Sequence, residues 1–364
     1  MRWLNTQHKP PCGPVLQVVT STDRRGAETF AVELGARLEH LGHSVTTMAL
    51  TDGSGANTLD LPTLGEGALV PRTLAALRRA SSRASVVIAH GSTTLPACAL
   101  ALSFGSVPFV YRNIGDPTFW SARLPARLRT MLWLRRSRAV VALTEESARV
   151  LTGQLRVPPR RVTVIPTGVS AEAHQPVTAE HRALARSAFG IPERAHVAAV
   201  VGALSPEKDV GLAIGAVARI PDLHLLVCGD GPDRVALEAT ANACAAERIH
   251  FIGALADPDP AFAAADLVVL SSRTEGLPAV LIEAGLRRLP VASCDVGYVR
   301  DIVADGVTGA LSETRAASDL ADAILRVTTL GREAGIEAQK HCLARFEIGT
   351  IAERWDQVLR RVAL

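Results

Sequence analysis

The sequence predicts an α/β fold with two doubly wound, Rossmann-like domains that face a central cleft. Short apolar runs alternate with Ala-, Leu- and Arg-rich helical patterns along the 364 residues. Strands that are apolar on both faces and joined by helices are typical of parallel sheets covered on both sides. The alternation stops at a polar stretch and then restarts, and this length exceeds one ordinary core. Two domains are therefore expected.

The strands follow from the positions of these apolar runs. In the first half they are expected at 15–20, 44–50, 85–90, 108–112, 139–144 and 162–166. In the second half they are expected at 196–202, 223–229, 249–253, 266–272 and 290–294. Each run is short and rich in Val, Ile, Leu or Ala, as buried parallel strands are.

Several Pro, Gly and His residues interrupt the pattern around 168–195, so a linker is expected there. The expected domains are 1–172 and 173–345, followed by a helix at 346–364 that packs back on the first domain. The apolar segment near 95–104 is too short to span a bilayer and predicts a buried helix.

Composition indicates a globular protein of a reducing compartment. Hydrophobic residues make up 48% and charged residues 21% of the chain, which suits a full core. The six cysteines form no C-x-x-C pair, so core thiols are expected rather than disulfides or a zinc site. The first residues, M-R-W-L-N-T-Q-H-K-P-P-C-G, contain no apolar signal segment, and a cytoplasmic location is expected.

Charge is distributed unevenly along the chain. Up to residue 170 there are 20 Lys and Arg against 10 Asp and Glu, whereas the remainder has 19 against 26. The two halves therefore meet different electrostatic demands, or the basic half contacts an anionic partner.

The most informative stretch is T-E-G-L-P-A-V-L-I-E-A-G, residues 274–285. It follows an expected strand, and Pro278 fits the first turn of a helix, where its missing N–H costs nothing. The N–H groups of Gly276 and Leu277 then lie at the helix start, where backbone dipoles favour an anion. This stretch predicts a binding site for a phosphate or a similar group.

Two carboxylates, Glu275 and Glu283, flank this helix start. The structural alternative is that Glu275 caps the helix and Glu283 faces solvent. The neighbours of Glu283 weaken that alternative because they are apolar: Val280, Leu281 and Ile282.

Two other turns follow strands in the second half. V-V-G-A-L-S-P-E-K-D places Lys208 just before a helix, where a lysine suits phosphate binding, although alone it is more often a surface residue. V-C-G-D-G-P-D-R, residues 227–234, resembles a dinucleotide fingerprint without its third glycine. A tight strand-to-helix turn is expected there, with Pro232 in the first helical turn.

E-G-L-P-A-V-L-I-E resembles the E-x7-E signature of the retaining GT-B glycosyltransferases of family four. Further segments resemble landmarks of this family in its order: 25–45, 140–151, 164–169, 202–209, 228–232 and 305–309. The resemblance covers nearly the whole chain. It implies the GT-B fold and transfer of a sugar from a nucleotide-diphosphate donor, with a UDP-sugar favoured, to a hydroxyl acceptor through an α-linkage.

The resemblance also implies roles in the second half. Glu275 would contact the sugar hydroxyls near the reacting carbon, and Glu283 would bind the ribose hydroxyls. The backbone of Gly276–Pro278 would meet the donor sugar and phosphate, while Lys208 would neutralise the leaving diphosphate. The family often has Arg where this chain has Ala203.

In the first half, Gly26 would let a loop approach the donor phosphates. The loop reads Arg25-Gly26 where the family usually has two glycines, so Arg25 is a candidate for the missing positive charge. His90 aligns with a family histidine that positions donor and acceptor, although a histidine at a strand end is more often structural.

The resemblance implies a nucleotide-sugar co-substrate and neither a metal nor another cofactor. Asp257-Pro258-Asp259 matches the D-x-D pattern of metal-dependent glycosyltransferases of another fold. Because it lies between prolines before a helix, a capped loop is expected instead.

Two alternatives remain open from the sequence. One is a sugar-nucleotide epimerase or phosphorylase with the same fold, against which the E-x7-E spacing counts. The other is a two-domain sugar-binding protein without turnover, a class that is usually exported. The acceptor is a polysaccharide, a lipid-linked sugar or a small molecule of glycoconjugate or natural-product biosynthesis, and no nucleic-acid partner is expected.

The segment 120–138, W-S-A-R-L-P-A-R-L-R-T-M-L-W-L-R-R-S-R, offers one indication of the acceptor side. Leu124, Leu128, Met131 and Leu132 share a helical face surrounded by arginines. The helix lies either on anionic lipid at the inner membrane face, or with this face on the core and its arginines in solvent.

Overall fold

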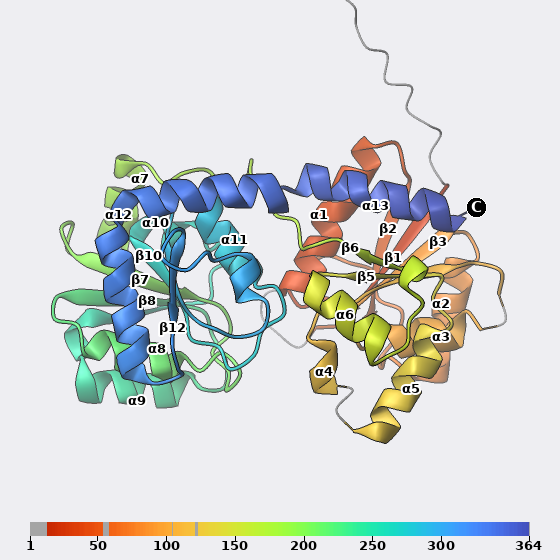
Figure 1. The fold of residues 1–364 in the computed structure, drawn as a ribbon, viewed down its shortest axis with the longest axis horizontal. Coiled ribbons are helices and arrows are strands. Elements are labelled where there is room, and N and C mark those ends of the chain that lie inside the picture. The colour runs from red at the N-terminus through yellow and green to blue at the C-terminus, as the bar shows by residue number, and fades with distance from the viewer. Residues whose placement is uncertain (1–12, 54–57, 104, 121–122, 364) are drawn as a thin grey trace, which may run out of the picture. The chain divides into compact units, whose positions relative to one another are not determined.

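The computed structural model describes residues 13–53, 58–103, 105–120 and 123–363. Cys12 and the segment used for the signal-peptide expectation lie outside these residues. The chain divides into two compact units, shown in Figure 1. Unit 1 comprises Met1–Gly168 and Ile348–Leu364, and unit 2 comprises Val169–Glu347. Each unit is described on its own.

Unit 1 is built on a parallel sheet with the strand order β2-β1-β3-β4-β5-β6. Its strands are β1 (Val15–Ser21), β2 (Val45–Thr51), β3 (Val86–His90), β4 (Phe109–Arg112), β5 (Ala139–Ala142) and β6 (Val162–Val164). The register places Val15 beside both Val45 and Val86. The central strands are buried on both faces, as their apolar runs predict.

Helices cover both faces of this sheet. They are α1 (Gly26–His40), α2 (Pro71–Ser81), α3 (Thr94–Ala101), α4 (Pro117–Trp120), α5 (Leu124–Leu134), α6 (Glu145–Gly153) and α13 (Ile348–Ala363), with a 3-10 turn at Pro159–Arg161. One apolar core joins the sheet to α2, α3, α5 and α6, and the other joins it to α1 and α13. The predicted apolar helix near 95–104 is α3, and it is mostly buried.

The helix α13 belongs to the core of unit 1. Its buried residues recur every three or four positions and include Ile351, Trp355 and Leu359. They pack with strand residues of the sheet and with the buried face of α1. At the edge of this contact, Oδ1 of Asp356 lies 2.6 Å from Nε2 of His43.

Unit 2 has a parallel sheet with the order β12-β11-β10-β7-β8-β9. Its strands are β7 (His196–Val201), β8 (Leu223–Cys228), β9 (Ile249–Gly253), β10 (Leu267–Leu270), β11 (Val291–Cys294) and β12 (Gly309–Ser312). The order reverses at β7, whose neighbours are β8 on one side and β10 on the other. The loops after β7 and β10 therefore diverge at the carboxyl edge, where doubly wound sheets bind ligands.

The helices of unit 2 lie on both faces of its sheet. They are α7 (Ala179–Ala188), α8 (Val210–Ala218), α9 (Arg234–Cys244), α10 (Asp259–Ala264), α11 (Ala279–Leu286) and α12 (Ala317–Phe346), with 3-10 turns at Ala246–Arg248 and Val299–Asp301. Within α12 the helix is broken at Gly331, whose φ is +64°. In the described residues, no helix combines the length and the apolar composition that a bilayer span requires.

The predicted fold class is confirmed, and each expected strand is present within one or two residues of its predicted bounds. Three details differ. The expected linker contains α7, the strand β12 was not predicted because G-A-L-S is hardly apolar, and Pro278 caps α11 rather than lying inside its first turn. Of the described cysteines, four are buried thiols and Cys244 is exposed, so none forms a disulfide.

Candidate functional site

The loops after β7 and β10 bring Lys208 and Glu275 together. Nζ of Lys208 donates a hydrogen bond of 2.6 Å to Oε1 of Glu275. The same oxygen accepts a second one, also of 2.6 Å, from Oγ of Ser272. The side chain of Glu275 is 8% exposed and that of Lys208 31%, so the carboxylate is the more deeply enclosed partner. Because the lysine is only partly covered, its charge remains accessible from solvent.

Two arginines, Arg273 and Arg315, contact Asp209, the residue before α8, and these three residues are called the brace. Asp209 adopts a left-handed conformation, with φ of +46°. Its Oδ2 lies 2.5 Å from Nη2 of Arg315 and 3.1 Å from Nη2 of Arg273. Nη1 of Arg315 also donates to the carbonyl oxygens of Ser271 and Ser272 at the end of β10. The brace thus ties the loop that carries Lys208 to the loop that carries Glu275.

These arginines were not among the predicted site residues. Arg273 adjoins the signature stretch, so its basic charge was a local signal that could have identified it. Arg315 lies beyond β12, and no spacing in the sequence links it to Lys208. Ala203 itself is exposed, and the brace places two arginines at Asp209, the residue that follows Lys208.

The backbone at the start of α11 presents unpaired N–H groups. Within the described residues, the N–H groups of Gly276 and Leu277 donate no hydrogen bond, and no side chain caps the helix. The loop after β11 fixes this turn, because Tyr298 donates its backbone N–H to the carbonyl of Gly276 at 3.1 Å. Gly297 has φ of +55°, and a Cβ there would lie 1.9 Å from the carbonyl oxygen of Glu275. The turn is therefore held with its amides available for an anion.

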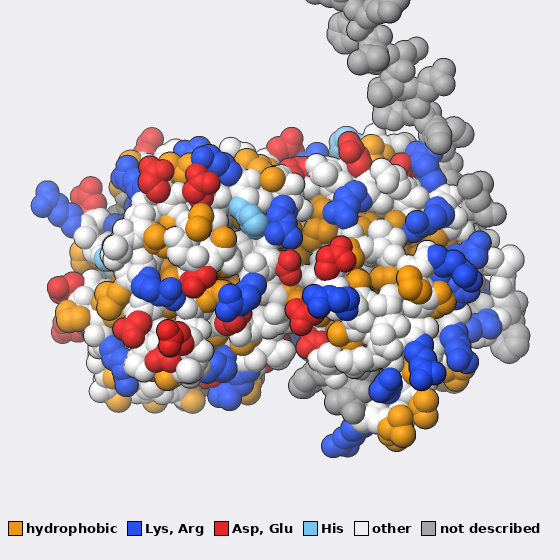
Figure 2. Space-filling model, viewed as in Figure 1, with side chains coloured by type: hydrophobic (Ala, Val, Ile, Leu, Met, Phe, Trp, Pro, Cys, Tyr) orange, Lys and Arg blue, Asp and Glu red, His pale blue; other side chains and the backbone are white. Residues whose placement is uncertain are grey.

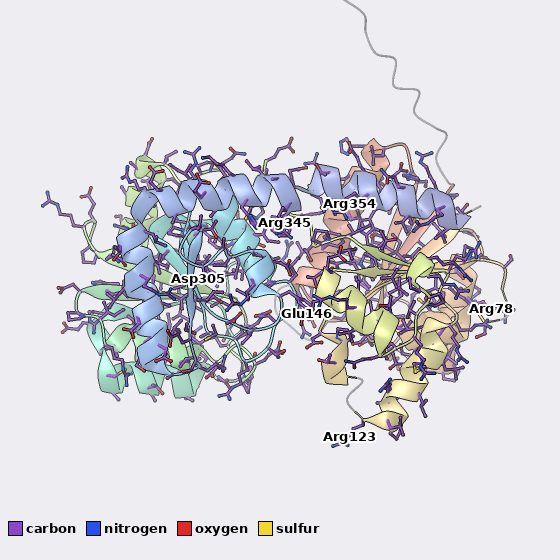
Figure 3. All side chains as sticks on the ribbon, in the orientation of Figure 1. Arg78, Arg123, Glu146, Asp305, Arg345 and Arg354 are labelled. Carbon is purple, nitrogen blue, oxygen red and sulfur yellow. The ribbon has the colours of Figure 1, made fainter. Side chains whose placement is uncertain are left out.

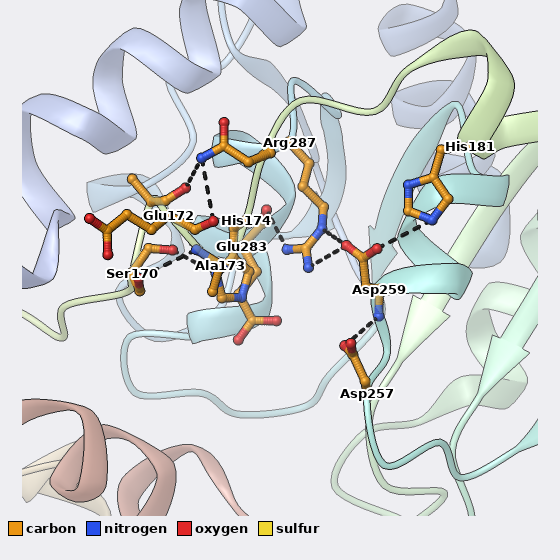
Figure 4. Close-up of polar contacts among 11 residues, drawn as sticks. Ser170, Glu172, Ala173, His174, His181, Asp257, Asp259, Glu283 and Arg287 are labelled. Atoms are coloured by element: carbon orange, nitrogen blue, oxygen red, sulfur yellow. Dashed lines mark hydrogen bonds and ion pairs between the residues drawn. The ribbon is translucent and has the colours of Figure 1, made fainter. Parts of the chain in front are cut away.

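Glu283, on α11, differs electrostatically from Glu275. Its half-buried carboxylate makes no hydrogen bond or ion pair with another described residue. Burial raises the pKa of the Glu283 carboxyl, and Arg287 opposes this rise. Nη1 of Arg287 donates instead to the backbone carbonyl of Glu283, at 3.3 Å (Figure 4). This carboxylate is therefore available to accept hydroxyl hydrogen bonds.

Arg287 connects α11 to the segment Asp257–Asp259. Its Nε and Nη2 lie 2.9 and 2.8 Å from Oδ1 of Asp259 (Figure 4). Its guanidinium also stacks over the ring of Phe262. Oδ1 of Asp257 accepts the backbone N–H of Asp259 at 3.0 Å. These contacts confirm the predicted capped loop. In the described part of the chain, no three His, Cys, Asp or Glu side chains gather as metal ligands, and metal independence stays a prediction.

The turn after β8 is a tight turn, as predicted, although Pro232 precedes the N-cap residue Asp233 of α9 instead of lying in its first helical turn. Gly229 has φ of +154°, and a Cβ on it would lie 1.8 Å from the carbonyl oxygen of Gly202. A Cβ on Gly231 would likewise meet the carbonyl of Leu204, at 2.3 Å. The two glycines therefore let this turn pack directly against the loop that follows β7 and leads to Lys208.

In unit 1, Gly26 is the first residue of α1 and Arg25 caps the helix. No atom lies within 4 Å of the position that a Cβ on Gly26 would take, so the backbone is open there. The side chain of Arg25 is exposed, and its Nη2 lies 3.3 Å from Oδ2 of Asp23. Any anion at this loop therefore competes with Asp23 for the guanidinium.

His90 lies inside the core of unit 1 rather than on a loop. It is the last residue of β3 and is 1% exposed, between the rings of Phe30 and Trp355. Its Nε2 is 3.0 Å from Oε1 of Gln17. Burial, together with the charge of Arg112, holds the pKa of His90 well below its usual value. These contacts favour the structural alternative for His90, and its catalytic role stays a prediction.

The raised pKa of Glu283 predicts a pH-dependent effect of Glu283→Gln on stability. The folded protein retains a proton at this carboxyl that the unfolded chain loses near pH 4.3. The stability that the protonated Glu283 carboxyl contributes to the wild-type protein is therefore present at low pH. It is lost as the pH rises through the pKa of this carboxyl in the folded state. The variant cannot ionise, so its free energy of unfolding should rise relative to wild type between pH 4 and pH 8.

Urea unfolding across this range measures the difference. Glu333→Gln, on an exposed position of α12, provides the control and should show no such trend. If the difference in free energy of unfolding between wild type and Glu283→Gln does not change with pH, the pKa of this carboxyl is not raised in the folded protein.

Comparison with known proteins gives a family model for each half of the chain. The model of glycosyl transferases group 1 matches residues 182–341, and the model of glycosyltransferase family 4 matches residues 24–173. The first match lies within unit 2, and the second lies mainly within unit 1.

Curated relatives match over a shorter range. D-inositol 3-phosphate glycosyltransferase of Mycobacterium sp. (strain KMS) is 33% identical over 211 residues, which cover 54% of this chain and 47% of the relative. The 2-deoxystreptamine glucosyltransferase of Streptomyces kanamyceticus is 34% identical over 202 residues, which cover 53% and 52%. The chain thus spans about half the length of the curated relatives it matches.

Solved structures share the fold over nearly the full length. Anabaena HepE, solved in complex with UDP-glucose, has 21% identity and a TM-score of 0.83, with 96% of this chain and 99% of HepE covered. Sucrose-phosphate synthase from Thermosynechococcus elongatus has 18% identity and a TM-score of 0.83, with 96% and 98% covered. Together with the two family models, which span most of the sequence, these likenesses show that the chain belongs to the group 1 glycosyltransferases of the GT-B fold.

Proposed function

We propose that the protein is a retaining, metal-independent glycosyltransferase. It moves a hexose or related sugar from a UDP-sugar to a hydroxyl acceptor and forms an α-linkage. The names of the curated relatives support sugar transfer, and the UDP-glucose in the HepE structure supports a uridine donor. The acceptor class is a polysaccharide, a lipid-linked sugar or a small molecule.

One arrangement carries this proposal. Around the start of α11 lie a lysine, two unpaired amides and an unpaired carboxylate. Lys208 and the amides of Gly276 and Leu277 suit the diphosphate, because a cation and a helix start stabilise negative charge without a metal. Glu283 accepts hydrogen bonds from the ribose hydroxyls, and Glu275 accepts them from the transferred sugar.

The proposed reaction needs no covalent intermediate on Glu275. Oε1 of that residue is already engaged by Lys208 and Ser272, which lowers its nucleophilicity. The bond from the anomeric carbon to the diphosphate oxygen breaks, and the acceptor oxygen bonds to that carbon on the same face. The acceptor proton passes to the leaving diphosphate oxygen, whose charge Lys208 stabilises.

Product analysis distinguishes the proposal from its alternatives. UDP-, GDP- and ADP-sugars are incubated with the protein in EDTA, and slow nucleotide release is followed. Release of UDP and an α-configured sugar product is expected. Sugar phosphate formed only with orthophosphate would indicate a phosphorylase, an altered donor sugar would indicate an epimerase, and tight binding of unchanged donor would indicate a binding protein.

Lys208→Ala should lower kcat by about 10²–10³-fold, as loss of one preorganised group at a developing oxyanion does. The variant also leaves the Glu275 carboxylate without its cation. Lys340→Ala is the matched control, since Lys340 is an exposed lysine of the same unit that pairs with Glu337. Steady-state kinetics with a UDP-sugar measure both variants, and equal rates for the two would contradict the assigned role.

Arg25→Ala should weaken donor binding, because we propose that this side chain supplies positive charge to the donor phosphates. Its exposure and its contact with Asp23 leave the guanidinium able to exchange partners. Calorimetric titration with UDP measures the affinity. Arg37→Ala, a change of the same charge at the other end of α1, serves as the comparison, and an unaltered UDP affinity in Arg25→Ala would show that the proposal is wrong.

A further inference from the structure

We propose that unit 1 carries a phosphate-binding pocket beside an exposed leucine stripe, and that together they dock the protein on an anionic lipid surface. The inference rests on unit 1 alone and does not depend on the proposed transferase activity.

The leucine stripe runs along α5. Leu124, Leu128 and Leu132 are 64%, 57% and 61% exposed, although they recur every four residues as a helix face does. The core contacts come from another side of the helix, where Leu134 is buried and Met131 packs against the core. Of the two arrangements that the sequence leaves open for this face, the one on the core is therefore excluded for Leu124, Leu128 and Leu132. Figure 2 shows hydrophobic side chains gathered over this part of unit 1.

The surroundings of the stripe are positively charged. Between Asp116 and Glu145 the sequence contains no acidic residue and six arginines: Arg123, Arg127, Arg129, Arg135, Arg136 and Arg138. Where their side chains bond to described residues, the acceptors are backbone carbonyls, as for Arg127 with Gln154 and Arg136 with Ser103. Carbonyl contacts leave the positive charge uncompensated, so this surface attracts anions.

A pocket of about 220 Å³ lies beyond the carboxyl end of α5. It is lined by the end of α3, by the segment 105–108 before β4, and by four arginines: Arg135, Arg136, Arg138 and Arg161. Pockets that hold drug-sized ligands measure about 300–1,000 Å³, and a water molecule in the liquid takes about 30 Å³. The pocket therefore suits a phosphate group rather than a whole nucleotide sugar.

The pocket lies away from the loops that were assigned to the donor. Its lining segments immediately precede β4, β5 and β6, so they belong to the amino edge of the sheet. Gly26 follows β1 at the carboxyl edge. In the described residues the guanidinium groups of Arg135 and Arg138 make no hydrogen bond, and guanidinium forks match phosphate oxygens.

The stripe and the pocket form one surface. Arg135 is the C-cap of α5 and follows Leu132 by three residues, so the line of leucines leads to the cationic lining. A free phosphate would explain the arginines but leave the leucines in water. An anionic bilayer satisfies both, since the leucines enter the acyl boundary while the arginines meet the headgroup phosphates.

Vesicle co-sedimentation of the full chain tests the proposal. Binding to phosphatidylglycerol–phosphatidylcholine vesicles is expected, with a decline as salt increases, and none to phosphatidylcholine alone. Arg135→Gln with Arg138→Gln should lower the partition coefficient about 25-fold, because each basic residue near such a surface contributes about five-fold. Leu128→Ser with Leu132→Ser should lower it as well.

Arg78→Gln with Arg79→Gln is the matched control. These arginines are exposed on α2 and give the same change of charge on another helix. Figure 3 shows Arg78 apart from Arg123, the residue that precedes α5. The proposal requires that this control keep wild-type binding, and circular dichroism confirms that each variant is folded.

Several results would overturn the proposal. Equal losses in the α2 control and the pocket variant would indicate nonspecific attraction of a basic protein. Unchanged binding in the leucine variant would exclude insertion of the stripe. Pocket-dependent stabilisation by inorganic phosphate without vesicle binding would assign the pocket to a soluble phosphate compound, and absence of binding to both vesicles would leave the leucines to a protein partner.

Discussion

The guanidinium of Arg315 links the two loops of unit 2 that carry Lys208 and Glu275. It contacts the two carbonyls at the end of β10 and the carboxylate of Asp209 before α8. The ladder between β7 and β10 pairs Leu267 with Ala198 and Val268 with Ala199, and the two loops continue beyond it. There the contacts of Arg315 hold the loops together with a backbone hydrogen bond, which Arg273 N–H donates to the carbonyl of Glu207. Asp209 adopts its left-handed conformation where these contacts meet. The brace thus stabilises the arrangement in which Lys208 pairs with Glu275.

The signature stretch, residues 274–285, contains two carboxylates with opposite electrostatic environments. Glu275 is compensated by a lysine and a serine hydroxyl, whereas Glu283 is half-buried on α11 without a hydrogen-bonding partner in the described residues. An uncompensated carboxylate costs stability, and proteins retain such costs where a ligand offsets them. Glu275 is therefore held in place by its hydrogen bonds, whereas Glu283 remains able to accept hydrogen bonds from a ligand.

The sequence was sufficient for what depends on local pattern. Apolar runs identified the strands, and the glutamate pair with its glycine and proline located the start of α11. Contacts between distant segments could not be predicted, as for Arg315, which lies 40 residues after Glu275. The strand β12 was missed for another reason, because it lacks an apolar run. Periodicity also groups residues on a face without saying what that face contacts, so the sequence left open whether the leucines of α5 meet lipid or the core. For His90, the alignment suggested a site residue, but burial between Phe30 and Trp355 depends on α13, more than 250 residues later.

The route of the chain has a consequence for its synthesis. Unit 2 is continuous in sequence, so all the residues of its core are available once residue 347 has left the ribosome. Unit 1 is discontinuous, and the face of its sheet that α1 and α13 share is only partly covered until the residues of α13 are synthesised. The unit that is translated first is therefore completed second. During that interval it exposes apolar surface that chaperones bind and that favours aggregation.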